Sequence, residues 1–151
     1  MVEDIKFIKS LNLQDKTLDV GSLDVNGNIK KYCEGFYLGL DMRKGKNVNI
    51  QASSHNLPFK SKSFDNVISI GTLEHDPAFW LSIDEMKRVL KIGGKLILSI
   101  PNYKFKMHYH PKDYWRFSED ATQILFNRFS DLTFWEISSD DCCRVWGVKS
   151  E

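Results

Sequence analysis

The sequence predicts an α/β fold in which helices cover a mostly parallel, doubly wound sheet. Short strand candidates alternate with helix candidates along the chain, and this alternation is typical of parallel sheets. The run Lys95–Ile100 is apolar at nearly every position, as expected for a strand covered on both faces. Only the turn-like run Ser138–Asp141 separates the last two strand candidates, which predicts an antiparallel hairpin at one sheet edge.

The N-terminal half predicts one helix followed by several short strands. Ile5, Ile8 and Leu11 have the spacing of one apolar helix face, so a helix is expected over residues 2–11. Gly35 closes a second, short helix candidate, because glycine tolerates the left-handed backbone at a helix end. The other elements expected here are that short helix over 28–34 and strands over 17–20, 36–40, 48–51 and 66–70.

The C-terminal half contains the clearest helix candidate. Phe79, Ile83, Met86 and Leu90 recur at helical spacing and form one apolar face. The pair Gly93-Gly94 is expected to stop this helix, since glycine is a poor helix former. The elements expected after it are a strand over 95–100, a helix from its N-cap Ser118 to 128, and strands over 132–137 and 142–148.

The 151 residues predict a single domain spanning 1–151, because no linker rich in proline, glycine or serine divides them. Little room exists for a full helix between Asp41 and Val48, or between Ser54 and Asp65. Helices on one face of the sheet are therefore expected to be short or missing. Because no substrate domain is inserted, we expect an open site or one completed by another subunit, which leaves a homo-oligomer open.

Composition and charge exclude several classes of protein. The formal net charge is +1, whereas a nucleic-acid binder usually carries a clear basic excess, so a nucleic-acid partner is not expected. No apolar run approaches the roughly 20 residues of a membrane span, and the first residues carry acids where a secretory signal needs basic residues. Cys33, Cys142 and Cys143 make a poor disulfide framework, so reduced thiols and a cytoplasmic location are expected.

Candidate ligand-binding residues follow the first two strand candidates. In open α/β sheets, ligands bind at the carboxyl ends of the strands. Gly21 follows the first strand and lets the backbone approach a ligand, where a Cβ atom would intrude. Asp41 follows the second strand at the spacing of a carboxylate that accepts hydrogen bonds from both hydroxyls of a ribose. Together the two residues predict an adenosine-like cofactor.

The loop after the first strand discriminates among such cofactors. A dinucleotide needs a Gly-x-Gly-x-x-Gly cradle for its pyrophosphate, but only Gly21 and Gly27 are present. Asp19 and Asp24 would repel phosphate, and they would suit a ligand with a ribose, a positive amine and no phosphate. S-adenosylmethionine fits that description, whereas the cofactor of a nicotinamide oxidoreductase does not. The alternative left open is that the glycines serve only the turn and Asp19 is a capping residue.

Short motifs in the middle of the chain follow one another in a specific order. They are Leu57-Pro58-Phe59, Ser63-Phe64-Asp65, Leu73-Glu74-His75, Arg88-Val89-Leu90-Lys91 with Gly93-Gly94, and Asp113-Tyr114-Trp115-Arg116-Phe117. With these motifs, the stretch from about Thr17 to Phe117 resembles the class I S-adenosylmethionine-dependent methyltransferases, most closely their small stand-alone members. The resemblance implies a Rossmann-like methyltransferase sheet and S-adenosylmethionine as the cofactor.

The resemblance also implies roles for the residues at the strand ends. Asp41 matches the acid that binds the ribose, and Met42 beside it would pack on the adenine. Gly71 and Thr72 follow the fourth strand and would line the cofactor beside its transferable methyl group. The residues that match the loop around the methionine portion are Asp19, Gly21 and Ser22.

Two positions depart from the family pattern. Ser53, followed by Ser54, stands where such enzymes often carry an aspartate that bonds the adenine amine, so a serine hydroxyl or a backbone group would have to substitute. Leu23 and Val25 stand at the usual later glycines of the first loop.

Histidines supply the candidates for proton transfer and for metal binding. His75 follows the fourth strand, where an imidazole could take a proton from an oxygen or nitrogen nucleophile. The alternative is a histidine that only orders the loop or touches the cofactor. His108 and His110 share one loop, but they are too few for a metal ion and no third ligand has a recognisable spacing, so no metal site is expected.

The loop Asn102–Phe117 follows the fifth strand and is the expected acceptor side of the site. It is rich in groups that stack and donate hydrogen bonds, and a loop of this length in a small domain is usually functional or disordered. Packing over the sheet end is the alternative, as is pairing of its arginine with Glu119 or Asp120. The substrate-binding candidates are Tyr103, His108, His110, Tyr114 and Arg116.

The sequence therefore predicts an S-adenosylmethionine-dependent methyltransferase that moves a methyl group to a small-molecule acceptor by direct in-line displacement. The alternative is a non-catalytic protein that keeps the fold and serves as a binding or regulatory subunit. The acceptor itself is not predicted, because specificity depends on side chains placed on a shared fold.

Overall fold

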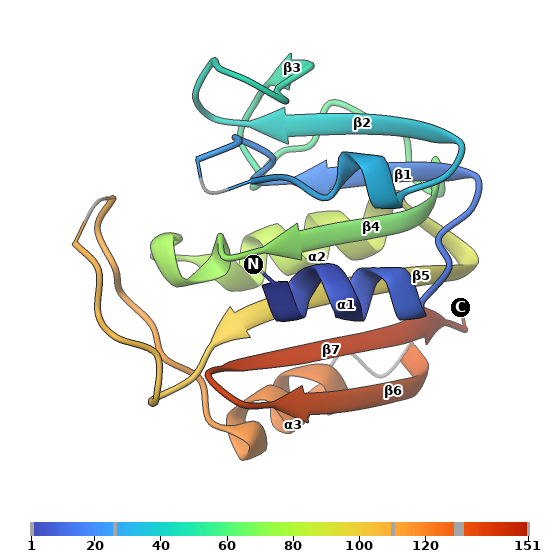
Figure 1. The fold of residues 1–151 in the computed structure, drawn as a ribbon. Helices are drawn as coiled ribbons and strands as arrows, with labels where there is room; N and C mark the ends of the chain where they lie inside the picture. The colour runs from blue at the N-terminus through green and yellow to red at the C-terminus, as the bar shows by residue number, and fades with distance from the viewer. Residues whose placement is uncertain (1, 26, 110, 129–131, 151) are drawn as a thin grey trace.

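A computed structural model describes residues 2–25, 27–109, 111–128 and 132–150, with the backbone alone over 126–128 and 132–139. Within them, seven strands form one sheet in the order β3-β2-β1-β4-β5-β7-β6 (Figure 1). The strands are β1 (Lys16–Val20), β2 (Phe36–Asp41), β3 (Ile50–Gln51), β4 (Phe64–Ile70), β5 (Leu90–Pro101), β6 (Leu132–Ser139) and β7 (Cys142–Lys149). The helices are α1 (Val2–Ser10), α2 (Phe79–Val89) and α3 (Glu119–Arg128), with 3-10 turns η1 (Lys30–Tyr32) and η2 (Leu73–His75).

Strands β1 to β5 are parallel, and the last two strands are antiparallel. β1 pairs with β2 and β4, β2 with β3, and β4 with β5, all in parallel. β7 pairs antiparallel with both β5 and β6. The carboxyl ends of β1, β2, β4 and β5 therefore meet at one edge of the sheet (Figure 1). The predicted mostly parallel α/β sheet with a C-terminal antiparallel hairpin is confirmed.

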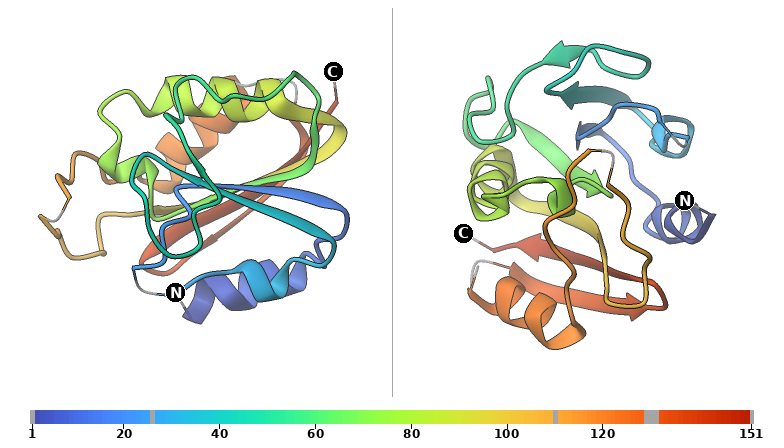
Figure 2. Two further views of the ribbon diagram at one scale, coloured as in Figure 1. Left: turned by 90° about the horizontal axis from the view of Figure 1, so that it is seen from above. Right: turned by 90° about the vertical axis from the view of Figure 1, so that its left-hand side faces the viewer.

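Helices cover the two faces of the sheet unequally. α1 and η1 lie on one face, and α2 and α3 lie on the other (Figure 2). Successive residues of β4 serve opposite faces, because Val67 packs with the apolar side of α2 and Ile68 packs with α1. Ile83 and Met86 bring the apolar side of α2 into the core, where burying one such side chain contributes about 1.5–3 kcal/mol.

The α1 face is thinly covered, as expected. Between β1 and β2 the described residues form only the single turn η1 instead of the helix predicted over 28–34. Gly27 and Gly35 both have a positive φ and bracket this short segment. The described residues contain no helix between β2 and β3. The segment between β3 and β4 contains none either, and it packs on α2 at the other face. The prediction of shortened helices is confirmed.

The boundary between α2 and β5 corrects one expectation. Gly93-Gly94 does not stop the helix: α2 ends at Val89, and β5 begins at Leu90 and runs through both glycines. Leu90 is extended, fully buried and paired with Phe64 of β4. An apolar residue that fits the helical spacing fits a buried strand equally well, and pairing with β4 decides between the two.

The predicted helix start at Ser118 is confirmed. The Ser118 hydroxyl accepts a hydrogen bond of 3.0 Å from the backbone N–H of Ala121, as a helix N-cap does.

Within the described residues, no helix has both the length and the apolar composition that crossing a membrane requires. Cys33, Cys142 and Cys143 are free and buried, in agreement with the expected thiols.

Candidate cofactor and acceptor site

The loops that follow β1, β2, β4 and β5 form the candidate site at the carboxyl edge of the sheet (Figure 2). Backbone hydrogen bonds fix the first of these loops against β2. Gly21 N–H and Ser22 N–H both donate to the carbonyl of Leu40, over 2.8 and 3.0 Å. The turn after β1 is therefore held beside the residue that precedes Asp41.

Gly21 meets the loop after β4 rather than open space. Its φ is +86°, a conformation that residues with a side chain rarely adopt. A Cβ atom at this position would lie 2.0 Å from the hydroxyl oxygen of Thr72. The expected obstacle to a side chain was a ligand, and the structure corrects this: the first obstacle is the neighbouring β4 loop. The two predicted cofactor loops are in direct contact here.

Asp41 ends β2 with its carboxylate at the expected edge. Oδ1 accepts a hydrogen bond from Arg43 N–H at 2.8 Å, and Oδ2 accepts one from Leu23 N–H at 3.4 Å. A carboxylate offers about four acceptor positions, so capacity remains for the hydroxyls of a ribose. The backbone contacts hold the carboxylate in one orientation, which suits the predicted role.

Asp19 lies beneath this edge rather than on it. Its carboxylate is buried and accepts a hydrogen bond from the Tyr37 hydroxyl, which in turn accepts one of 2.8 Å from the Asn47 amide. Burial raises the pKa of Asp19 to about 6; the Tyr37 hydrogen bond opposes this shift, and the nearby charge of Asp41 adds to it. A direct contact of Asp19 with a ligand amine stays a prediction.

Asp19 makes the stability of the protein depend on pH. Its folded-state pKa of about 6 lies above its usual value of 3.8, so between these pH values the folded state keeps a proton that the unfolded state has lost. The resulting stabilisation is present at low pH and is lost as the pH rises through about 6. Asp19→Asn mimics the neutral carboxyl group at every pH.

Relative to the wild type, the free energy of unfolding of Asp19→Asn should therefore rise by roughly 2–3 kcal/mol between pH 4 and pH 8. Urea denaturation at both pH values measures this change. Asp84→Asn, which alters an exposed acid of α2, serves as the control and should show no such rise. A pH-independent difference for Asp19→Asn would contradict the buried, protonated carboxyl group.

The segment after β2 packs on the loop after β1 and corrects one charge argument. Ser22 Oγ donates to the carbonyl of Asn47 at 3.1 Å, and the Asn47 amide donates back to the carbonyl of Ser22 at 3.0 Å. Lys46 Nζ lies 2.9 Å from Asp24 Oδ2. Asp24 was expected to repel phosphate, but the ammonium group of Lys46 is paired with it. The argument against a dinucleotide therefore depends on the missing glycine cradle.

The expected adenine contacts lie on the surface. The Met42 side chain is exposed beside Asp41, where it is available to a planar ring. Ser53 is exposed and its hydroxyl accepts a hydrogen bond of 3.2 Å from His55 N–H. Ser54 Oγ lies 2.8 Å from Ser82 Oγ of α2. Roles of these three predicted residues in binding adenine stay predictions.

Beside them lies a polar cluster around Asp76 that the sequence patterns did not predict. The Asp76 carboxylate accepts hydrogen bonds from Ala78 N–H and Ser82 Oγ, and His55 Nε2 lies 2.8 Å from it. The signal that could have found it is an aspartate just before a helix, where its carboxylate satisfies free N–H groups. The cluster joins the segment around Ser54 to the start of α2.

Glu74 and His75 of the turn η2 lie beside His108 of the acceptor loop. The spacing of these residues in the sequence did not predict this contact. His75 Nδ1–H donates to the carbonyl of Lys112 at 2.9 Å, and its Nε2 lies 3.0 Å from His108 Nε2 and 3.7 Å from Glu74 Oε1. Glu74 is 3% exposed, and burial raises its pKa to about 7. Burial lowers the pKa of His75 and favours its neutral form. Glu74 was quoted within a motif but given no role.

The acceptor loop is attached to this same turn. Tyr114 N–H donates to the carbonyl of Glu74, and Trp115 Nε1–H donates to the carbonyl of Asp76, both at 2.8 Å. Trp115 also packs against Phe79 with ring centroids 5.5 Å apart, so the packing alternative holds for this residue. Tyr103, Tyr109 and Tyr114 are exposed and remain available to an acceptor. His110 lies outside the described residues.

Arg116 has a structural partner different from those expected. Its guanidinium pairs with both carboxylate oxygens of Asp113 at 2.5 Å, and it also donates to the carbonyls of Phe105 and Lys106. The pairing with a structural acid that the sequence left open is confirmed, but the acid is Asp113 and not Glu119 or Asp120. Asp113 precedes Arg116 by three residues, so this spacing was available in the sequence. The contacts favour a role in holding the loop over a role in binding an anionic substrate.

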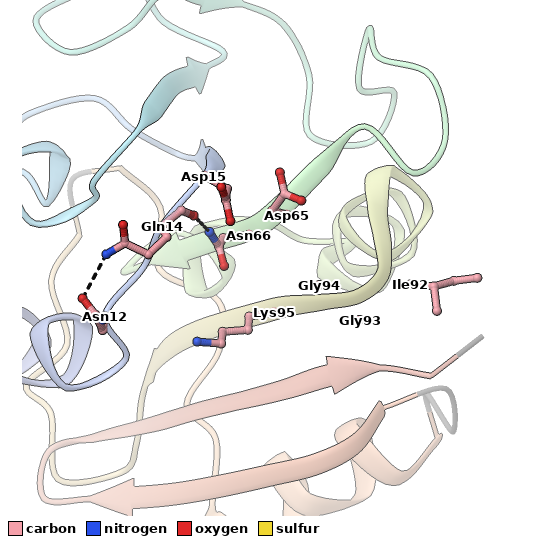
Figure 3. A pocket seen from close by; sticks show the side chains of 9 residues that line it. All are labelled: Asn12, Gln14, Asp15, Asp65, Asn66, Ile92, Gly93, Gly94 and Lys95. Carbon is pink, nitrogen blue, oxygen red and sulfur yellow. Dashed lines mark hydrogen bonds between the residues drawn. The ribbon is translucent and has the colours of Figure 1, made fainter.

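Two hollows in the described surface lie away from the expected cofactor position. One of about 280 Å³ is at the opposite edge of the sheet, beside the start of β4 and the glycines of β5 (Figure 3). There the Asn66 amide donates to the carbonyl of Gln14 at 2.6 Å. A second hollow of about 270 Å³ lies between Tyr103 and the start of α3, at the base of the acceptor loop.

Comparisons with known proteins agree with this fold. The chain is 30% identical over 115 residues to an uncharacterised protein of Methanocaldococcus jannaschii, which matches 66% of this chain and 51% of that protein. The chain thus spans about half the length of this curated relative. An S-adenosylmethionine-dependent methyltransferase of Thermotoga maritima, described as a possible histamine N-methyltransferase, superposes with a TM-score of 0.79 at 15% identity, over 99% of this chain and 89% of that one. One from Aquifex aeolicus gives 0.69 at 16% identity, over 95% and 88%.

The sheet order, the glycine turn after β1 and the acid after β2 define an α/β protein with the fold of S-adenosylmethionine-dependent methyltransferases. A family model described as a methyltransferase domain matches residues 11–98, more than half of the chain. The chain belongs to this methyltransferase domain family, and its cofactor is S-adenosylmethionine. The residues present fit this cofactor, since Asp41 retains acceptor capacity and Met42 is open to a ring.

Proposed function

We propose that the protein transfers the methyl group of S-adenosylmethionine to a small-molecule acceptor. The observation that carries the proposal is the meeting, at one sheet edge, of the Gly21–Thr72 contact, the Asp41 carboxylate and the loop 102–117. The name of the Thermotoga maritima structure refers to histamine, which is a small molecule. A net charge of +1 offers little electrostatic attraction for nucleic acid, which also favours a small acceptor.

S-adenosylmethionine, when bound, supplies a methyl group on a positively charged sulfur. The residues of the chain bind and orient it: Asp41 holds the ribose, Met42 packs on the adenine, and the Gly21 turn receives the methionine portion. Loop 102–117 holds the acceptor in line with the methyl group, and such orientation contributes several kcal/mol to catalysis. The three free, buried cysteines suit a reducing compartment such as the cytoplasm.

The acceptor must also lose a proton when its nucleophile is a hydroxyl or a protonated amine. His75 is positioned for this step, because its Nδ1–H donates to Lys112 and its Nε2 faces the acceptor loop. This Nε2 lone pair either takes the proton or holds a cation that lowers the pKa of the acceptor group.

Asp41→Ala tests the cofactor site. Removing the ribose acceptor is expected to weaken S-adenosylmethionine binding by roughly 1.5–3 kcal/mol, the range for hydrogen bonds to a charged group, which is about 10- to 150-fold in Kd. Isothermal titration calorimetry measures the change. The control is Asp65→Ala, which removes an acid paired with Lys91 at the opposite sheet edge and should leave the Kd unchanged.

A second measurement follows the methyl group itself. S-adenosylmethionine carrying a labelled methyl is incubated with the protein and a panel of small amines, phenols and carboxylates, and labelled product is separated by chromatography. Transfer to one of these classes supports the proposal. Cofactor binding with no transfer to extracts or panel would favour a non-catalytic binding protein, and equal Kd values for Asp41→Ala and the wild type would remove Asp41 from the site.

A further inference from the structure

We propose that Glu74, His75 and His108 form a binding site for one divalent transition-metal ion on the acceptor side of the molecule. Each residue offers one ligand atom, and the three atoms lie within 4.8 Å of one another. They come from two separate segments, the turn η2 after β4 and the loop after β5, which the fold brings together.

The distances between the ligand atoms suit one shared ion. Two nitrogens that each lie about 2.1 Å from a tetrahedral zinc ion are about 3.4 Å apart. His75 Nε2 lies 3.0 Å from His108 Nε2 and 3.7 Å from Glu74 Oε1. The three ligand atoms lie within 4.8 Å of one another, so side-chain movements of about an ångström bring all three within reach of one ion.

The opposite ring nitrogens of both histidines face groups that orient a metal ligand. His75 Nδ1–H donates to the carbonyl of Lys112 at 2.9 Å, and His108 Nδ1 lies 3.3 Å from Asp113 Oδ2. Metal-binding histidines usually direct their second N–H at a carbonyl or carboxylate in this way. When both Nδ1 atoms carry the proton, both Nε2 lone pairs point at each other, and a cation between them removes their repulsion.

An unpartnered oxygen at the cluster also indicates a missing positive group. Glu74 Oε2 is buried and has no hydrogen-bond partner among the described residues. An unpartnered buried polar atom costs about 1–3 kcal/mol. The guanidinium of Arg116 does not fill this need, because it is paired with Asp113.

Access and ligand type indicate which ions fit. His108 is 40% exposed in its side chain and His75 16%, so an ion can enter from the acceptor loop. Two imidazoles and one carboxylate favour zinc, cobalt or ferrous iron over magnesium or calcium. Three protein ligands leave a position open for water or an acceptor oxygen or nitrogen. The role of the ion in activating an acceptor rests on the proposed function, whereas its binding does not.

Cobalt(II) is a suitable probe, because its visible absorption reports nitrogen ligands. Titration of chelator-treated protein is expected to show one ion bound per chain, with absorption bands in the visible range. Glu74→Gln, His75→Ala and His108→Ala should each weaken the Kd by at least roughly 100-fold, the upper range even for residues that only support a ligand. His55→Ala is the control: His55 also lies 2.8 Å from a carboxylate, yet this variant should bind like the wild type.

Failure of this inference is distinct from failure of the proposed function. S-adenosylmethionine binding is measured by calorimetry on the metal-free protein, which requires no ion. No saturable cobalt binding by the wild type would overturn the metal site and leave His75 as the proton acceptor. Wild-type affinity in both His75→Ala and His108→Ala would also overturn it. If Glu74→Gln does not fold by circular dichroism, His108→Ala, on the partly exposed loop, decides the question.

Discussion

Gly21→Val is expected to abolish S-adenosylmethionine binding and to lower the free energy of unfolding. The position has a φ of +86°, which costs a residue with a side chain about 1–2 kcal/mol. An added Cβ would also lie 2.0 Å from Thr72 Oγ1, so the β1 and β4 loops would have to separate. Because both loops belong to the cofactor site, calorimetry should detect no binding while circular dichroism still reports a folded protein.

Gly93→Val separates the cost of the positive φ from the cost of the clash with Thr72. Gly93 has a similar φ of +77° but no atom within 4 Å of the added Cβ, and it lies in β5 away from the site. This control should lose only the roughly 1–2 kcal/mol of backbone strain and should bind the cofactor. The double variant Gly21→Val with Thr72→Ala should recover part of the lost stability. Wild-type cofactor affinity in Gly21→Val would show that the glycine is only a turn residue.

Arg144→Leu is expected to lower the free energy of unfolding by about 3–5 kcal/mol, the usual cost of breaking a buried ion pair. Arg144 Nε lies 2.9 Å from Asp4 Oδ1, and the two side chains are 4% and 6% exposed. This pair joins α1 to β7, and Ser99 Oγ of β5 donates to the same Asp4 oxygen at 2.6 Å. Removing the guanidinium takes a buried positive charge away from the Asp4 carboxylate. Urea denaturation measures the loss.

Two further variants show whether the burial of the Asp4–Arg144 pair causes the lower free energy of unfolding of Arg144→Leu. Asp141→Asn removes an acid that lies 3.6 Å from the same guanidinium but is half-exposed, so it should change stability by less than about 0.5 kcal/mol. Asp4→Asn combined with Arg144→Leu removes both charges and should recover part of the stability of the single variant. Equal stability of Arg144→Leu and the wild type would contradict a structural role for this pair.

Local patterns in the sequence were sufficient for the fold class, and the order of the family motifs was needed as well for the cofactor. The spacing of Ile83 and Met86 predicted α2, because a helix places such residues on one face whatever it packs against. The glycine after β1 and the acid after β2 predicted the cofactor edge, because parallel strands bring their carboxyl ends together. These inferences needed only the order of residues along the chain.

The tertiary structure decided which charged and polar groups meet. Lys46 lies beside Asp24, and His108 Nε2 faces His75 of a different segment. Burial raises the pKa of Asp19 to about 6, which its place in the sequence does not reveal. These contacts join segments that the sheet order and the loop packing bring together. Periodicity carries no information about such pairs, because it records which face a residue occupies and not what lies opposite that face.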